Sequence, residues 1–293
     1  MTGPRPTGNR SLVTRIRMHE SSFPVRIFDV DAFGDLRTAV LLRFLWQTAS
    51  DASTAVGYDL EWYERAGTLW IIRRTRVEVL TPPRYRDALT IRTWVADIRR
   101  VRSQREYDVR RADGTAVARA TTDWVYVDLA RGALVQPPLE MQRALMPEGV
   151  TSQPRLASLA ATPPAAAGRG SRRVELADLD TVSHVNNAQY SVFVEQMVWD
   201  ALAARGWHLE TTPTAARPRL VAHDLEYFEA ARYGDQLEGS VWVTAIDADR
   251  FDTDCQLTID GQRSLHARST WRWPDGPRPD ALRRAIDSLA ARA

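Results

Sequence analysis

Two stretches of the chain are copies of one pattern. Residues 25–57 read VRIFDVDAFGDLRTAVLLRFLWQTASDASTAVG, and residues 174–206 read VELADLDTVSHVNNAQYSVFVEQMVWDALAARG. They align without a gap at an offset of 149 (180 − 31), which places Asp31 over Asp180 and Gly57 over Gly206. A repeat of this length in a fixed register indicates a duplicated structural unit.

The repeat continues downstream at an offset of 148 (233 − 85), where Tyr85 meets Tyr233 and Trp94 meets Trp242. The chain of 293 residues is therefore about two units long. Between the units, residues 151–172 are rich in Ala, Pro and Gly, which is typical of a linker. The predicted parts are an N-terminal arm (1–22), a first unit (23–150), the linker (151–172), a second unit (173–276) and a C-terminal helix (277–293).

In each copy, one long helix is expected to precede a run of strands. Apolar residues recur at helical spacing from Tyr190 to Leu202, which predicts an amphipathic helix that begins near Asn186. In the first copy the stripe is less regular, and Asp35 is a candidate N-cap. The predicted strands are 68–80, 88–99, 103–111, 116–128, 220–227, 236–247, 251–259 and 264–273. This order predicts an α+β fold in which an antiparallel sheet wraps around a buried helix.

The composition narrows the classes of function. The sequence holds 39 Lys+Arg against 37 Asp+Glu, a balance that does not indicate nucleic-acid binding. The single cysteine excludes a disulfide framework, and the scattered histidines lack ligand spacing, so we predict no metal and no cofactor. No apolar run is long enough to span a bilayer or to form a signal core, and we therefore expect a cytoplasmic protein with no membrane partner.

The stretch from Asp178 to Asn187, DLDTVSHVNN, followed by Tyr190 and Glu195, resembles the signature of hotdog thioesterases. Within that superfamily the chain is similar to the acyl-ACP (acyl carrier protein) thioesterases, which carry two hotdog units in one chain. The first copy resembles their N-terminal half in residues 70–79, WIIRRTRVEV. The resemblance implies a tandem (double) hotdog that hydrolyses an acyl thioester of acyl carrier protein or CoA, as a pseudo-dimeric monomer or a homodimer.

The resemblance also implies catalysis in the second unit, through an Asp-x-Asn-x-His pattern and a downstream Glu or Cys. Asp180 and His184 match that pattern, whereas Val182 stands at the Asn position. The downstream pair falls on Ala230-Ala231, which cannot perform that chemistry, and Glu229 lies one position away. Either a variant arrangement operates here, or the reaction is not thioester hydrolysis.

The polar residues around this helix start define the candidate site. A carboxylate just before a helix N-terminus can act as a base or a nucleophile, and the free N–H groups of the helix can stabilise an oxyanion. The candidate catalytic residues are Asp180, His184 and Glu195, and the candidate substrate-binding residues are Asn186, Asn187 and Glu229. Asp31, the counterpart of Asp180 in the otherwise degenerate first copy, is a minor candidate.

Each of these residues also has a structural interpretation. Asp180 could accept hydrogen bonds from its own turn, and Asn186 or Asn187 could serve only as a helix cap. His184 could be a hydrogen-bonded structural histidine. Glu195, at the edge of the apolar stripe, could form a boundary salt bridge.

Three functions therefore stay open. The first is hydrolysis of a fatty or polyketide-type acyl thioester, and the second is dehydration or cyclisation of a chain that stays attached to its carrier. The third is acyl binding without catalysis. Three arginines within residues 99–102, together with Arg105 and Arg172-Arg173, could dock an acidic carrier protein, or they could simply keep a strand edge solvated.

Overall fold

The computed structural model describes residues 18–146, 154, 156–210, 212–213, 216–273 and 279–290. The first half contains β1 (His19–Pro24), α1 (Thr38–Thr54), α2 (Leu60–Ala66), β2 (Thr68–Val79), β3 (Ala88–Arg99), β4 (Arg102–Arg111), β5 (Ala116–Asp128), β6 (Ala133–Leu134) and α3 (Leu139–Leu145). The second half contains β7 (Gly168–Arg173), α4 (Gln189–Ala203), β8 (Arg219–Tyr227), β9 (Gln236–Ile246), β10 (Arg250–Ile259), β11 (Gln262–Arg272) and α5 (Asp280–Leu289). Short 3₁₀ helices, η1 (Ile27–Asp29) and η2 (Leu176–Asp178), precede α1 and α4.

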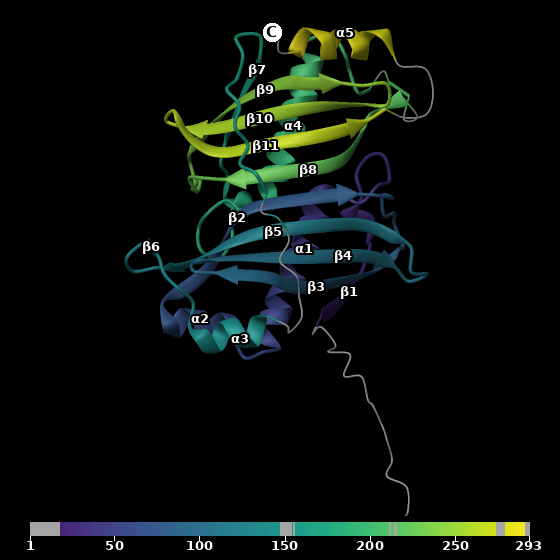
Figure 1. The fold of residues 1–293 in the computed structure, drawn as a ribbon. Coiled ribbons are helices and arrows are strands. Elements are labelled where there is room, and N and C mark those ends of the chain that lie inside the picture. The colour runs from purple at the N-terminus through teal and green to yellow at the C-terminus, as the bar shows by residue number, and fades with distance from the viewer. Residues whose placement is uncertain are drawn as a thin grey trace, which may run out of the picture.

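All these strands join one antiparallel sheet that runs through both halves. Its order is β1-β3-β4-β5-β2-β8-β11-β10-β9-β7, and β6 adds to β5. The halves meet where β2 pairs with β8, in a register that places Thr75 opposite Leu225. The two long helices α1 and α4 lie on one side of this sheet (Figure 1). The predicted α+β tandem hotdog is therefore confirmed.

The helices lie there because each has one apolar face. Leu41 and Leu45 of α1, and Phe193 and Val194 of α4, are each at most 1% exposed and belong to one core that spans both halves. A sheet covers such a stripe efficiently, since its inward-facing side chains alternate with outward-facing ones. The fold therefore places the N-terminal ends of α1 and α4 against the opposite half, where clefts between the halves form.

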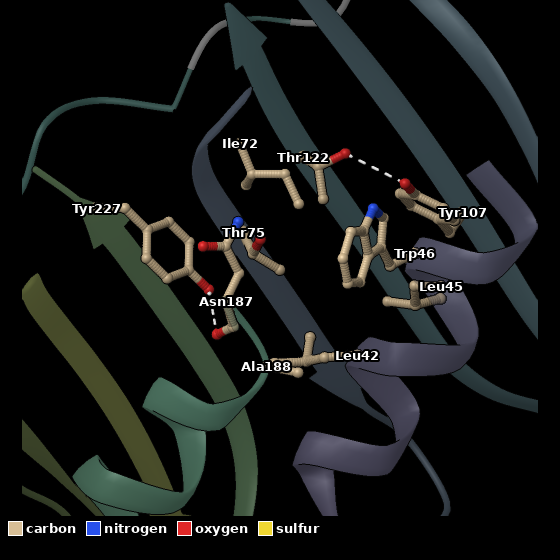
Figure 2. A pocket seen from close by; sticks show the side chains of 10 residues that line it. All are labelled: Leu42, Leu45, Trp46, Ile72, Thr75, Tyr107, Thr122, Asn187, Ala188 and Tyr227. Carbon is tan, nitrogen blue, oxygen red and sulfur yellow. Dashed lines mark hydrogen bonds between the residues drawn. The ribbon is translucent and has the colours of Figure 1, made fainter. Parts of the chain in front are cut away.

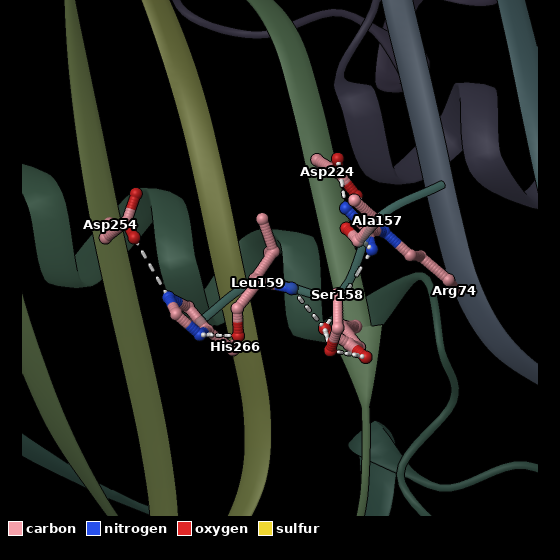
Figure 3. Close-up of polar contacts among 8 residues, drawn as sticks. Arg74, Ala157, Ser158, Leu159, Asp224, Asp254 and His266 are labelled. Carbon is pink, nitrogen blue, oxygen red and sulfur yellow. Dashed lines mark hydrogen bonds and ion pairs between the residues drawn. The ribbon is translucent and has the colours of Figure 1, made fainter. Parts of the chain in front are cut away.

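The linker crosses the outer face of the sheet, opposite the long helices (Figures 1 and 3). The amide of Leu159 donates to Glu226 Oε2 at 2.8 Å, and His266 bridges the Leu159 carbonyl (3.2 Å) and Asp254 (3.0 Å). Both His266 and Asp254 are fully buried as a result. The linker is thus a fixed part of the fold over its described residues.

The last part of the predicted linker is wrong. Gly168–Arg173 forms β7, which pairs with β9 at the edge of the sheet. A Cβ on Gly168 would lie 2.8 Å from Ala201 Cβ, and one on Gly170 would lie 2.9 Å from Met197 Sδ. These glycines therefore let α4 pack closely on the strand. In the sequence alone, their presence gives this strand the composition of a linker.

Several predicted boundaries also need correction. The helix α4 begins at Gln189 and not near Asn186, and the N-cap of α1 is Arg37 and not Asp35. Asp35 instead pairs with Arg84 (3.1 Å) and Arg219 (3.3 Å), so it links the two halves. Part of the predicted N-terminal arm forms the edge strand β1, while its residues up to 17 lie outside the described residues.

The prediction for the end of the chain is partly testable. Residues 280–289 form α5, which packs against β9 and α4, and the remaining residues of the predicted helix lie outside the described ones apart from 279 and 290. None of the helices in the described ranges is long and apolar enough to cross a membrane. The cytoplasmic location stays a prediction.

Candidate active site

The loop that enters α1 and the loop that enters α4 each contain a hydrogen-bonded turn of the same kind. Asp180 Oδ1 accepts the N–H groups of Val182 (3.0 Å) and His184 (3.4 Å). In the first half, Asp31 Oδ1 accepts those of Phe33 (2.7 Å) and Asp35 (3.1 Å). The two aspartates therefore hold equivalent turns, which is the structural role that turn chemistry favours for such a residue.

The two turns differ in their backbone conformation, in the residues around the aspartate and in whether the second carboxylate oxygen is available. Ser183 adopts a positive φ of 61°, where the first half has Gly34 at 79°. Within the described chain, Asp180 Oδ2 accepts no hydrogen bond, so one oxygen of this half-buried carboxylate remains available. His184 is half-buried on the same turn, at the position where the first half carries the buried Asp35.

The loop continues into α4 through two asparagines with different roles. Asn186 Oδ1 accepts the N–H of Ala188 at 2.9 Å, so Asn186 holds the turn that leads into the helix, whose N-cap is Ala188. The carbonyl of Asn187 accepts a hydrogen bond from the hydroxyl of Tyr227 at 3.1 Å (Figure 2). The N–H of Asn187 donates to no other described residue, so it is a backbone donor available at the N-terminal end of α4.

We name the space between this helix start and the first half the α4 cleft. It is lined by Leu42, Leu45 and Trp46 of α1, Ile72 and Thr75 of β2, Tyr107 and Thr122, and by Asn187, Ala188 and Tyr227 of the second half (Figure 2). Its free volume is only about 20 Å³. Trp46 also lines a second, larger cavity of about 350 Å³ inside the first half, which we name the first-half cavity. One side chain therefore lines both the space at the polar start of α4 and the first-half cavity.

The corresponding space in the other repeat, at the start of α1, is much larger. Glu195 stands at the repeat position of Trp46 (195 − 46 = 149), and it lines a cavity of about 320 Å³ together with Asp31 and Thr38. We name this space the α1 cleft. The Ser191 hydroxyl donates to Glu195 Oε1 at 2.9 Å. Burial raises the pKa of Glu195 to about 7, an effect that the Ser191 hydrogen bond reduces and the nearby Asp31 increases.

The structure thus separates the three predicted catalytic residues. Glu195 lies in the α1 cleft with Asp31, whose pKa is also raised by burial, while Asp180 and His184 lie at the other loop. The structure places Glu195 with Asp31 and not with Asp180, because the middle of α4 faces the loop of the opposite half. Glu229 is exposed in the turn after β8, where its carbonyl accepts a hydrogen bond from Ser264 Oγ at 2.8 Å.

The raised pKa of Glu195 predicts a dependence of stability on pH. The folded-state pKa of about 7 lies above the ordinary value of 4.5, so the folded state binds the proton more tightly than the unfolded chain. Stability should therefore fall by on the order of 2 kcal/mol as pH rises from about 5 to 8. The Glu195→Gln variant should lose this decline, measured as urea midpoints across the range. An equal decline in parent and variant would show that Glu195 does not cause it.

Each half of the chain matches a known protein family. Residues 17–141 match the family described as "Acyl-ACP thioesterase N-terminal domain", and residues 174–275 match the "Thioesterase-like superfamily". Both halves thus match thioesterase families, and the first half matches the acyl-ACP one. This confirms the resemblance that the DLDTVSHVNN stretch and the internal repeat indicate.

The curated relatives of this chain are distant in sequence. A palmitoyl-acyl carrier protein thioesterase of Arabidopsis thaliana is 25% identical over 91% of this chain and 66% of its own length. An oleoyl-acyl carrier protein thioesterase of Coriandrum sativum is 23% identical over 82% of this chain and 65% of its own. Both relatives are chloroplastic. The chain therefore spans slightly less than two thirds of the length of these curated relatives.

Solved structures support the same fold. The 12:0-ACP thioesterase from Umbellularia californica aligns with a TM-score of 0.73 at 19% identity, over 87% of this chain and 94% of that one. An acyl-ACP thioesterase from Bacteroides thetaiotaomicron aligns with a TM-score of 0.68 at 18% identity, over 87% and 97%. At such identities the agreement is one of fold.

The structure also shows where the missing family acid would lie. Ala231 is fully buried beside the predicted catalytic loop, because its carbonyl accepts the N–H of Val185 at 2.9 Å. Its own N–H donates to the hydroxyl of Tyr190 at 3.1 Å. The position that the resemblance assigns to the downstream acid is therefore next to the loop, but it carries a methyl group.

Sequence reasoning missed three residues that shape the site. Trp46 and Tyr227 line the α4 cleft, and Arg105 lines the first-half cavity although it was expected in an exposed basic cluster. The repeat register would have paired Trp46 with Glu195. Alternation along β4, where Arg105 shares a face with Tyr107 and Val109, would have placed Arg105 inside.

Proposed function

We propose that the protein hydrolyses acyl-ACP thioesters and releases a free acid at the α4 cleft. One observation carries this assignment: the polar start of α4 and the first-half cavity meet at Trp46, which lines both. A thioesterase needs such an arrangement, because the acyl chain must leave water while its carbonyl stays beside donors and a base. In this proposal the chain passes Trp46, and the thioester lies at Asn187 and Ala188.

The start of α4 supplies the groups for attack. The N–H of Asn187 is available, and the helix N-terminus favours the negative charge that develops on the carbonyl oxygen. Asp180 Oδ2 acts as the base that takes a proton from water, since Oδ1 is already held by the turn. The water oxygen forms a bond to the carbonyl carbon as the tetrahedral intermediate develops.

Collapse of that intermediate breaks the carbon–sulfur bond, and the proton that Asp180 took from water passes to the departing thiolate. His184, on the same turn as Asp180, is assigned the transfer of this proton. Asn187 is assigned to carbonyl binding and Asn186 to holding the turn before the helix. Glu229 has no role in this scheme, because it is exposed in the turn after β8.

The α1 cleft is the competing centre for the same reaction. Asp31 and Glu195 approach it from different halves, and a carboxyl group with a pKa of about 7 suits proton transfer near neutral pH. The α4 cleft is preferred because it alone of the two connects to the first-half cavity through a shared residue. Substitution of Asp180 and Asp31 in parallel distinguishes the two centres.

The test of the function is incubation with a panel of acyl-ACP and acyl-CoA thioesters, with free thiol and intact carrier mass followed together. Hydrolysis should release thiol and free acid, with acyl-ACP cleaved faster than acyl-CoA. Loss of water from a β-hydroxyacyl chain that stays on the carrier would instead identify a dehydratase, which the methyl group at Ala231 favours as the second candidate. Binding without any change in mass would identify a non-catalytic acyl-binding protein.

A further inference from the structure

The first-half cavity contains a buried arginine. Arg105 lies on the inward face of β4 between Ser103 and Tyr107, and it is 7% exposed. It lines the cavity of about 350 Å³ together with apolar side chains such as Leu69 and Trp70. An arginine is not needed to keep this cavity wall in contact with water. The role of the Arg105 guanidinium therefore depends on the groups that lie around it.

Arg105 has few partners for its five N–H groups. Across the described ranges, its one hydrogen bond runs from Nη1 to Thr93 Oγ1 at 3.4 Å, and no carboxylate lies within ion-pair distance. Burial lowers the pKa of Arg105, and the nearest titratable groups that act on it are the hydroxyls of Tyr107 and Tyr63. A buried charge without a countercharge is unfavourable in an apolar surrounding.

The remainder of the cavity offers no countercharge either. The described residues that line it include hydroxyl groups of Ser50, Ser53 and Ser103 but no Asp or Glu. A chain that ended in a methyl group would displace water from Arg105 and give it no acceptor in return. A chain that ended in a carboxylate would neutralise the charge and match the planar fork of the guanidinium.

We propose that the first-half cavity selects acyl chains that carry a carboxylate at their distal end, with Arg105 as the binding partner of that carboxylate. This inference rests on the proposed function, because it assigns the class of acyl group that enters past Trp46. The substrate would then be the half-thioester of a dicarboxylic acid. Arg105 is a specificity-determining residue in this assignment and takes no part in the reaction at α4.

The test compares three ACP thioesters of equal length: decanoyl, ω-hydroxydecanoyl and the mono-thioester of decanedioic acid. The parent should hydrolyse the decanedioyl thioester with a kcat/KM at least about tenfold above decanoyl. Arg105→Met should reverse this order, whereas Arg102→Met, an exposed neighbour on β4, should keep it. Equal rates for decanoyl and decanedioyl chains in the parent, or a preference for the ω-hydroxy chain, would overturn the inference.

A binding measurement separates this inference from the proposed function. The monomethyl ester of decanedioic acid should bind the parent more tightly than methyl decanoate in calorimetry, and Arg105→Met should abolish the difference. This comparison in the parent needs no variant and no turnover. If no thioester is cleaved but the diacid preference holds, the proposed function fails and the assignment of the cavity stands. If thioesters are cleaved without any diacid preference, only the assignment of the cavity fails.

Discussion

The Asp180→Asn variant should lose acyl-ACP hydrolysis by about a hundred- to ten-thousandfold in kcat, the usual range for removal of a general base. Asparagine keeps an oxygen that can accept the N–H groups of Val182 and His184, so the turn should persist. What disappears is the charge and the basicity of Oδ2. The loss should therefore appear in kcat with a thermal midpoint close to that of the parent.

Asp31→Asn is the matched control for this experiment. Asp31 holds an equivalent turn through Phe33 and Asp35, so the two variants make the same chemical change in the same local structure. Catalysis at the α4 cleft predicts that Asp31→Asn retains hydrolysis. The reverse result, with Asp180→Asn active and Asp31→Asn inactive, would move the reaction to the α1 cleft beside Glu195 and reject the proposed centre.

The sequence predicts the fold well because the fold is written in repeated patterns. Five of the eight predicted strands differ from the observed bounds by one residue at one end, and the strands at 88–99 and 116–128 match fully. Alternation and turn signals act over a few residues, so they are visible in the chain. The glycines of β7 were assigned to the linker because the need for glycine there comes from close contact with Ala201 and Met197, which are distant in sequence.

The site was harder to predict, since it is made by the meeting of two halves. The loop at Asp180 and the helix residue Glu195 are close in sequence, but the fold points Glu195 at the opposite loop. Trp46 gave no signal of its own, because a tryptophan on an apolar stripe is usually core. Only the alignment of the two repeats shows that Trp46 lines one cleft at the position where Glu195 lines the other.

The second large effect concerns the contact that joins the halves. Arg74 Nε and Nη2 donate to the two oxygens of Asp224 at 2.7 Å each, and Arg74 also donates to the carbonyl of Ala157 in the linker (Figure 3). Arg74 is 5% exposed. Arg74→Met should therefore lower the free energy of unfolding by about 3 kcal/mol, because it leaves the half-buried Asp224 carboxylate without its partner. Urea unfolding measures this loss.

Arg76→Met is the control, since Arg76 is exposed on the same strand and should change stability by less than about 0.5 kcal/mol. Adding Asp224→Leu to Arg74→Met should recover much of the loss, because the uncompensated charge is then gone. The strands joined by this ion pair carry Thr75 and Tyr227 into the α4 cleft. Arg74→Met should consequently inactivate at a lower temperature than the parent, whereas an unchanged stability would mean that β2–β8 pairing alone holds the cleft together.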